Sequence, residues 1–164
     1  MIDNNYIRLN RIIALLIFIV TFIVYFDTMA PTVSYWDCGE FIAVSHTLGV
    51  PHPPGSPFFL LMGRIFSMLP FNEDIAFRVN VISPLVSALA VMLLYLSTVK
   101  VITHWRGRVN NITDVMIVFG GGAVGALTFA FTDSHWFNAV EAEVYAFSTF
   151  FTAIVVWLIL LWNE

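Results

Sequence analysis

The residues best suited to chemistry gather in one stretch of the chain, WDCGEFIAVSHTLGVPHPPGSP, at positions 36–57. Asp37 and Glu40 are three residues apart, so on a helix the two carboxylates share one face. His52 follows, at the bend of a Pro-Pro-Gly loop whose consecutive prolines stiffen the backbone. Acid groups held on rigid backbone indicate a functional site, and such a carboxylate can act as a general base.

Helix capping is the competing interpretation of these acids. Ser34-x-x-Asp37 and Asp37-x-x-Glu40 both resemble capping boxes, and acids are favoured in the first turn of a helix. The histidine of the loop, His52, can equally be structural. We interpret the single cysteine, Cys38, as a small packing residue rather than a nucleophile, because no base stands at a spacing that the sequence can certify.

Composition places the chain in a membrane. Hydrophobic residues make up 59% of the 164 residues and charged residues 11%, and the mean hydropathy is +0.86, far above the range of soluble domains. The formal net charge of -4 excludes the dense basic surface that nucleic-acid binding requires. We therefore expect an integral membrane protein whose surroundings are the lipid bilayer.

Four apolar segments are long enough to cross a bilayer as helices, and they cover residues 12–30, 79–99, 115–132 and 144–162. Phe58–Leu69 is apolar but too short to span, so it is predicted to be an interfacial or re-entrant helix. The sequence predicts an all-α membrane protein, one domain over residues 1–164, with external loops at 31–78 and 133–143. The alternative for the first segment is a signal peptide cleaved after Ala30.

Basic residues set the expected orientation. With the N-terminus inside, five of the seven Lys and Arg residues are cytoplasmic, namely Arg8, Arg11, Lys100, Arg106 and Arg108. Both acid-bearing loops then share the non-cytoplasmic face and can build one site. That face is periplasmic in a bacterial inner membrane, our first expectation, or lumenal in the endoplasmic reticulum of a eukaryote.

The second external loop supplies further candidate ligands. Asp133 and His135, with Glu141 or Glu143, can ligate a divalent cation, although carboxylate and imidazole ligands at this spacing are a weak signal. The two glutamates can instead merely complement the dipole of the helix that follows them. The metal therefore stays unspecified.

Two arginines and two glycines complete the candidate features. Arg64 and Arg78 offer the planar fork that suits a phosphate, or they extend to lipid head groups. Gly121 and Gly125 form a G-x-x-x-G pattern in the third apolar segment, which predicts that a neighbouring helix approaches closely there.

The order of these residues resembles a known family. The resemblance rests on the runs Asp37-x-Gly39-Glu40-Phe41, His46-x-Leu48-Gly49-Val50-x-His52-Pro53-Pro54-Gly55-x-Pro57, Arg78-x-Asn80 and Glu141-x-Glu143-Val144-Tyr145-Ala146, together with Arg64. In order and spacing they are similar to the N-terminal part of domain-of-unknown-function family 2723, the transmembrane protein 260-like protein O-mannosyltransferases. The resemblance covers about residues 10–160.

The resemblance implies a GT-C type glycosyltransferase, a multi-span enzyme with its acid in the first external loop. Such an enzyme moves a mannose-like sugar from a polyprenyl-phosphate carrier to a hydroxyl of a protein or glycan acceptor on the non-cytoplasmic face. It has many more than four spans, so the chain is expected to be an N-terminal part that is inactive alone. No cofactor is certain, and a divalent cation is the candidate.

Within that reaction each site residue receives a role. Displacing a polyprenyl phosphate needs a base for the acceptor hydroxyl and donors for the leaving phosphate. Asp37 is assigned as the base, Glu40 as its partner or a ligand of a sugar hydroxyl. The phosphate ligands are Arg64, Arg78 and His52, and the secondary candidates for acceptor or metal contact are Glu141, Glu143, Asp133 and His135.

A transporter or channel subunit is the competing class, in which acids at the membrane edge bind protons or ions. Against it, no ionisable residue lies at the middle of any of the four apolar segments. A purely structural subunit would leave the acids and prolines of the first loop without a function.

Overall fold

The computed structural model describes residues 4–107, 109 and 111–162, and this part of the chain forms eight helices and no strand. Their bounds are α1 (Asn4–Thr28), α2 (Cys38–Thr47), α3 (Pro57–Met68), α4 (Ile75–Asn80), α5 (Ile82–Arg106), α6 (Ile112–Ala130), α7 (Asp133–Ala139) and α8 (Tyr145–Trp162). Four spans of the described chain are long and apolar enough to cross a membrane: α1, α5 together with the short α4 that leads into it, α6 and α8. The prediction of an all-α integral membrane protein is confirmed.

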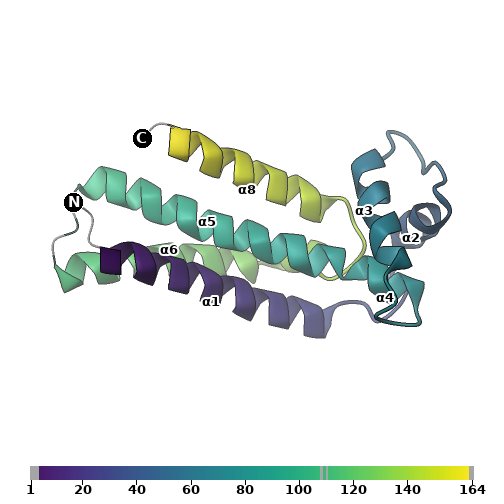
Figure 1. Ribbon diagram of the computed structural model, residues 1–164, viewed down its shortest axis with the longest axis horizontal. Coiled ribbons are helices and arrows are strands. Elements are labelled where there is room, and N and C mark those ends of the chain that lie inside the picture. Colours follow the sequence, from purple (N-terminus) through teal and green to yellow (C-terminus); the bar gives the residue numbers. More distant parts are fainter. Residues whose placement is uncertain (1–3, 108, 110, 163–164) are drawn as a thin grey trace.

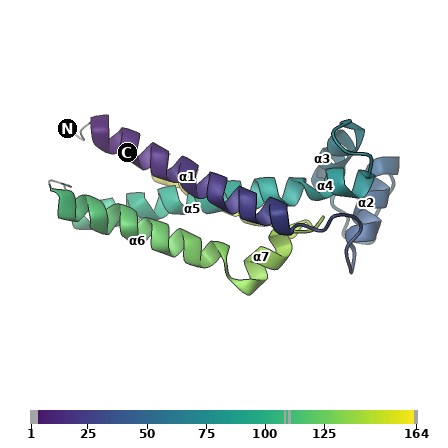
Figure 2. The ribbon, with the colours of Figure 1, turned by 90° about the horizontal axis from the view of Figure 1, so that it is seen from below.

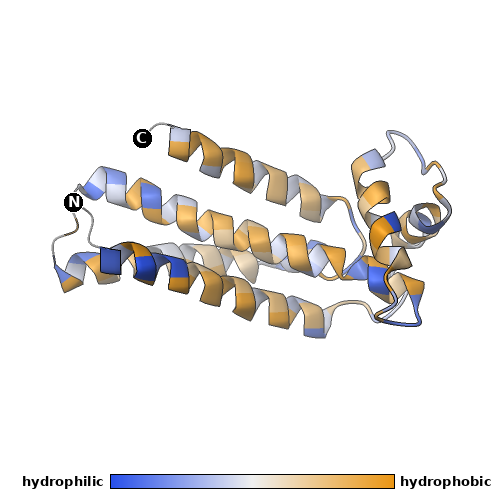
Figure 3. Cartoon of the chain, in the orientation of Figure 1, coloured by the Kyte–Doolittle hydropathy of each residue, from blue (hydrophilic) through white to orange (hydrophobic). Residues whose placement is uncertain are grey.

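The four long helices lie along the longest axis of the molecule, and α2, α3 and α4 gather at one end of it (Figure 1). The N-terminus of α1 lies at the opposite end (Figure 1). Apolar residues cover most of the long helices, whereas hydrophilic residues concentrate near their two ends (Figure 3). This distribution is the one that a bundle crossing a bilayer requires.

Helix α5 is the centre of the bundle, since it packs against α1, α6 and α8. A helix contacted on several sides is apolar around its circumference. Small buried side chains let those neighbours approach α5, among them Ser83, Ser87, Ala88 and Ala90. Larger buried groups, such as Tyr95, fill the space between α5 and its partners.

Helix bounds differ from the predicted spans where polar residues continue the helix. Helix α1 begins at Asn4 rather than at 12, and α5 runs on to Arg106 rather than ending at 99. Hydropathy marks only the part that matches the bilayer, while basic side chains can extend a helix into the head-group region. The predicted loop 133–143 contains a further helix, α7, which turns away from α6 (Figure 2).

The closest approach of a neighbouring helix is at Gly122, one residue after Gly121 and three before Gly125. A Cβ at Gly125 would meet nothing within 4 Å, and one at Gly121 would meet only Ile102 Cδ1, at 3.4 Å. A Cβ at Gly122 would lie 2.7 Å from Val99 Cγ2 and 3.2 Å from the ring of Tyr95. The G-x-x-x-G prediction was therefore wrong in position, because the pattern does not say which glycine faces the neighbouring helix.

Hydrogen bonds tie the last turn of α1 to distant parts of the chain. The Tyr25 hydroxyl donates to Ala130 O at 2.8 Å, and Ala30 N donates to Val140 O at 2.8 Å. The Asn80 amide donates to Ala30 O and to Thr32 O, at 2.8 and 2.9 Å. These bonds connect the end of α1 and the residues that follow it to α4, α6 and Val140.

The two acid-bearing segments lie at the same end of the bundle. The start of α1, the end of α5 and the start of α6 meet at the other end (Figure 1), and these elements carry Arg8, Arg11, Lys100 and Arg106. Arg108, the fifth residue of the orientation argument, lies outside the described residues. The arrangement separates the basic end from the acidic end, as the positive-inside argument requires.

Candidate functional site

Helix α2 presents Asp37 at its N-terminus. Asp37 occupies the N-cap position, but its side chain makes no capping hydrogen bond, and 59% of that side chain is exposed. The backbone just before it is unusual, since Trp36 has a φ of 58°, in the left-handed region. The capping interpretation of Asp37 is therefore wrong, and its carboxylate stays available to a ligand.

Glu40, in the first turn of α2, holds His52 by two bonds. One carboxylate oxygen accepts from the His52 backbone N–H at 2.8 Å, and the other lies 2.7 Å from His52 Nδ1. A turn closed by the bond from Gly55 N to His52 O, at 3.0 Å, carries the imidazole to this position. The glutamate thus fixes both the backbone and the ring of the histidine.

Asp37, Glu40 and His52 form what we call the acid–histidine cluster. His52 Nε2 lies 3.9 Å from Asp37 Oδ2, and one potential ligand atom from each of the three residues lies within 4.8 Å of the others. Carboxylate oxygen and imidazole nitrogen together suit several divalent cations. The cluster can therefore hold a cation or present a base and an imidazole to a substrate.

Hydrogen bonding shifts the ionisation of the cluster. The bond to Glu40 raises the pKa of His52, and the same bond lowers the pKa of Glu40. The charged pair therefore stabilises the fold between the two pKa values. Its contribution is lost as the pH rises through the pKa of His52 or falls through that of Glu40.

We expect Glu40→Gln to lower the pKa of His52 toward that of a free histidine, because the amide removes the charge that favours imidazolium. The measurement is the titration of the His52 ring by NMR in detergent micelles. Asp37→Asn serves as the comparison and should lower the His52 pKa less, since the Asp37 carboxylate is farther from the ring. An unchanged His52 titration in Glu40→Gln would contradict the hydrogen bond between them.

Two buried glutamates lie behind this surface. The Ser34 hydroxyl donates to Glu141 Oε2 at 2.6 Å, and the Cys38 thiol lies 3.8 Å from Glu143 Oε1. Glu141 is 3% exposed and Glu143 is 7% exposed. These contacts join the segment 31–78 to the segment 133–143, as the sequence predicts for a shared site.

Burial dominates the ionisation of this inner layer. It raises the pKa of Glu143, and the charges of Glu141 and Asp37 raise it further. Burial also raises the pKa of the Cys38 thiol, with the two glutamates adding to the effect. Cys38 is fully buried and belongs to a hydrophobic cluster, so its interpretation as a packing residue is confirmed.

Helix α3 packs closely against α2. A Cβ placed on Gly63 would lie 2.8 Å from Ser45 Cβ and 2.4 Å from Ser45 Oγ. Phe41 of α2 packs on Phe59 of α3, with ring centroids 5.5 Å apart, and on the His52 ring at 5.9 Å. The acid–histidine cluster is thus positioned by an aromatic layer and one glycine contact.

The two arginines assigned to phosphate bond to backbone carbonyls. Arg64 donates to His46 O in the last turn of α2, about 14 Å along the helix from the end that carries Asp37, at 1.5 Å per residue. Arg78 donates to Leu69 O at 2.9 Å. Among the described residues, no hydrogen bond or ion pair joins either guanidinium to the cluster, so their phosphate role stays a prediction.

Asp133 and His135 lie on α7 and are not grouped with Glu141 and Glu143 among the residues that the structure describes. His135 is 6% exposed and packs between the rings of Tyr25 and Phe129, at 6.0 and 4.3 Å. Burial lowers the pKa of His135 to about 4. Asp133 is exposed.

Sequence reasoning missed the roles of two polar residues that bond to distant parts of the chain. The sequence offers Ser34 only as a candidate cap, whereas its hydroxyl bonds to Glu141. Asn80 entered only as part of the family pattern, yet its amide holds the backbone at Ala30 and Thr32. A signal for Asn80 existed, because an amide at the start of an apolar run needs polar partners when it is buried.

A bundle of membrane-length apolar helices, with exposed carboxylates and an imidazole at one end, defines an integral membrane protein with a candidate site at that end. The family "Protein O-mannosyl-transferase TMEM260 N-terminal domain" matches residues 37–164. This chain belongs to that family. The match includes every residue of the acid–histidine cluster.

Curated relatives agree with the family. The Dictyostelium discoideum "Protein O-mannosyl-transferase tmem260" is 32% identical over 87% of this chain, and the Mus musculus "Protein O-mannosyl-transferase TMEM260" is 30% identical over 78%. The aligned region covers 16% of the length of each of these relatives. No solved structure matches the chain.

Proposed function

We propose that the chain forms the N-terminal part of a membrane glycosyltransferase of the GT-C type. The whole enzyme would move a mannose-like sugar from a polyprenyl-phosphate carrier to a hydroxyl of a protein or glycan. Support comes from the names of its relatives, which are protein O-mannosyl-transferases. The observation that carries the proposal is the uncapped, exposed Asp37 carboxylate beside an oriented His52.

The reaction is a single displacement at the anomeric carbon. The acceptor oxygen attacks this carbon, the bond to the phosphate oxygen breaks, and the phosphate leaves with the bonding electrons. Asp37 takes the proton of the acceptor hydroxyl, which is the work of a general base. One carboxylate is enough for this inverting course, whereas a retaining one would form a glycosyl-enzyme intermediate.

His52 is the best-placed of the three proposed phosphate ligands. Its raised pKa favours the imidazolium form, which donates hydrogen bonds to anionic oxygen. Arg64 and Arg78 would first have to release the carbonyls of His46 and Leu69. We therefore propose that His52 meets the phosphate first and that later parts of the full-length protein supply further cations.

The test uses membranes that contain the full-length protein and radiolabelled polyprenyl-phosphate mannose. We expect label in protein acceptors, and none when the 164-residue chain is expressed alone, because four spans cannot enclose a lipid-linked sugar. If the full-length protein transfers no label to protein acceptors, the proposal is wrong. Ion flux without transfer would instead favour the transporter alternative.

The proposed orientation has its own test, made in the full-length protein with its cysteines replaced. A cysteine introduced as Ser56→Cys should react with a membrane-impermeant thiol reagent added to sealed cells or vesicles on the non-cytoplasmic side. One introduced as Ile112→Cys, at an exposed position of the basic end, should react only after permeabilisation. The opposite pattern would place the acid–histidine cluster in the cytoplasm and contradict the donor assignment.

A further inference from the structure

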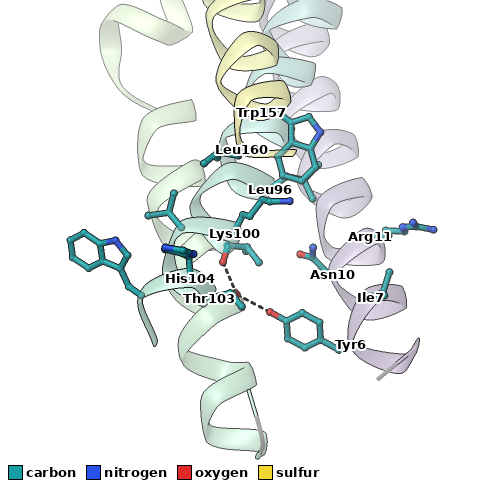
Figure 4. Close-up of a pocket in the computed structure, with 13 residues that line it drawn as sticks. Tyr6, Ile7, Asn10, Arg11, Leu96, Lys100, Thr103, His104, Trp157 and Leu160 are labelled. Carbon is teal, nitrogen blue, oxygen red and sulfur yellow. Dashed lines mark hydrogen bonds between the residues drawn. The ribbon is translucent and has the colours of Figure 1, made fainter. Parts of the chain in front are cut away.

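A cavity lies at the basic end of the bundle, away from the acid–histidine cluster. It encloses about 670 Å³ between α1, α5 and α8. The residues that matter for its chemistry are Tyr6, Asn10, Lys100, Thr103, His104 and Trp157. Figure 4 shows Asn10 and Lys100 directed into the space between α1 and α5, with Trp157 of α8 above them.

The cavity contains a cation and hydroxyl groups. The Lys100 ammonium lies 5.3 Å from the centre of the Trp157 ring. The hydroxyls of Tyr6 and Thr103 lie 3.1 Å apart and share a hydrogen bond (Figure 4). The Thr103 hydroxyl donates to Val99 O at 2.8 Å, so Tyr6 is the donor in the shared bond and the Tyr6 oxygen is left as an acceptor. The ammonium therefore suits the oxygens of a phosphate, and the Tyr6 oxygen suits a hydroxyl.

One polar atom of the cavity has no partner. Asn10 Oδ1 is buried and accepts no hydrogen bond in the described structure. A buried acceptor without a donor costs free energy, so it marks a place where a ligand donor belongs. A ligand that supplies both a phosphate and a hydroxyl would satisfy this cavity.

The position of the cavity along the bundle is the one expected at the boundary of a bilayer. Lys100 stands six residues before the end of α5, about 9 Å along the helix at 1.5 Å per residue. Trp105 and Trp157 both line the cavity, and tryptophan concentrates at the level of lipid head groups. Exposed apolar residues of α8, such as Val155 and Phe151, continue from there toward the bilayer centre.

We propose that this cavity binds the head group of an anionic glycerophospholipid that carries a free hydroxyl, in the leaflet at the N-terminal end of the bundle. Lys100 receives the phosphate, and hydroxyls of the head group donate to Asn10 Oδ1 and to the Tyr6 oxygen. The acyl chains lie along the apolar surface of α1 and α8. Basic pockets between membrane helices bind anionic lipid head groups in this way. A soluble phosphate has the same charge but no chains for that surface.

The test measures phosphatidylglycerol binding to the purified full-length protein by native mass spectrometry, with phosphatidylcholine as the neutral comparison. We expect one phosphatidylglycerol to be retained, and Lys100→Gln to weaken its binding about fivefold, the change expected for one charge at a membrane surface. Lys100→Arg keeps the charge and should retain the lipid. Arg8→Gln is the matched control, because it removes an equal charge from the same end but does not line this cavity.

Each other result overturns the proposal. If Arg8→Gln weakens phosphatidylglycerol binding as much as Lys100→Gln does, the lipid is held by general attraction to a basic surface and not by this cavity. Equal retention of phosphatidylcholine would exclude an anionic site, and displacement of the lipid by millimolar inorganic phosphate would show a site for soluble phosphate. A full-length protein that retains no lipid would mean that later segments of its own chain fill the cavity.

Discussion

Asp37→Asn is expected to lower the rate of sugar transfer by the full-length protein at least about a hundredfold. General-base catalysis contributes about 10²–10⁴-fold, and asparagine cannot take the proton of the acceptor. The structure removes the competing explanation, because Asp37 makes no capping bond whose loss could unfold α2. The measurement is transfer from polyprenyl-phosphate mannose at matched membrane expression.

The control for Asp37→Asn is Glu73→Gln, which neutralises another exposed acid of the same external segment outside the cluster. Its transfer rate should stay close to that of the wild type. Glu40→Gln should fall between the two, since Glu40 acts through the orientation of His52. If Asp37→Asn keeps more than about a third of the wild-type rate, Asp37 is not the base on this scale of effects.

Gly63→Val is expected to separate α2 from α3 and to expose Cys38. The new side chain must displace Ser45, whose Cβ would lie 2.8 Å from even the first added carbon. Such overpacking costs about 1–3 kcal/mol, which raises the open population of α2 by about 5- to 150-fold. The measurement is the labelling rate of the buried Cys38 thiol in a full-length background whose other cysteines are replaced.

Gly120→Val is the matched control for Gly63→Val. A Cβ at Gly120 meets nothing within 4 Å, so the same substitution there should leave Cys38 labelling unchanged. Adding Ser45→Gly to Gly63→Val should restore part of the protection, because it removes the two atoms that clash. Equal labelling in the Gly63 and Gly120 variants would show that the contact between α2 and α3 does not hold the site together.

Hydropathy was enough to predict the fold class, and the turn residues around His52 indicated which stretch carries the candidate site. Four long apolar segments fixed the number of candidate spans, and the prolines around His52 marked the loop that carries it. The expectation that the two external segments meet is supported by the bond between Ser34 and Glu141. Alternation of polar and apolar segments is a strong signal because the bilayer leaves a chain few options.

The pairings inside the site could not be read from the sequence. Glu40 and His52 are separated by 12 residues, and only the path of the loop decides that they meet. Arg64 and Arg78 carry the charge that a phosphate needs, but their bonds to His46 O and Leu69 O depend on how α3 and α4 pack. Residue type sets what a side chain can do, while the backbone sets what it reaches.

The bonds between the two external segments have a consequence for biosynthesis. Ser34 and Glu141 are 107 residues apart in the chain, and Cys38 and Glu143 are 105 apart. At about 5–20 residues per second, a ribosome needs roughly 5 to 20 s to make the chain between them. During that interval the segment that carries Ser34 and Cys38 has been synthesised, but Glu141 and Glu143, its later partners, have not. The first segment can therefore reach its final contacts only after α5 and α6 have been synthesised and inserted.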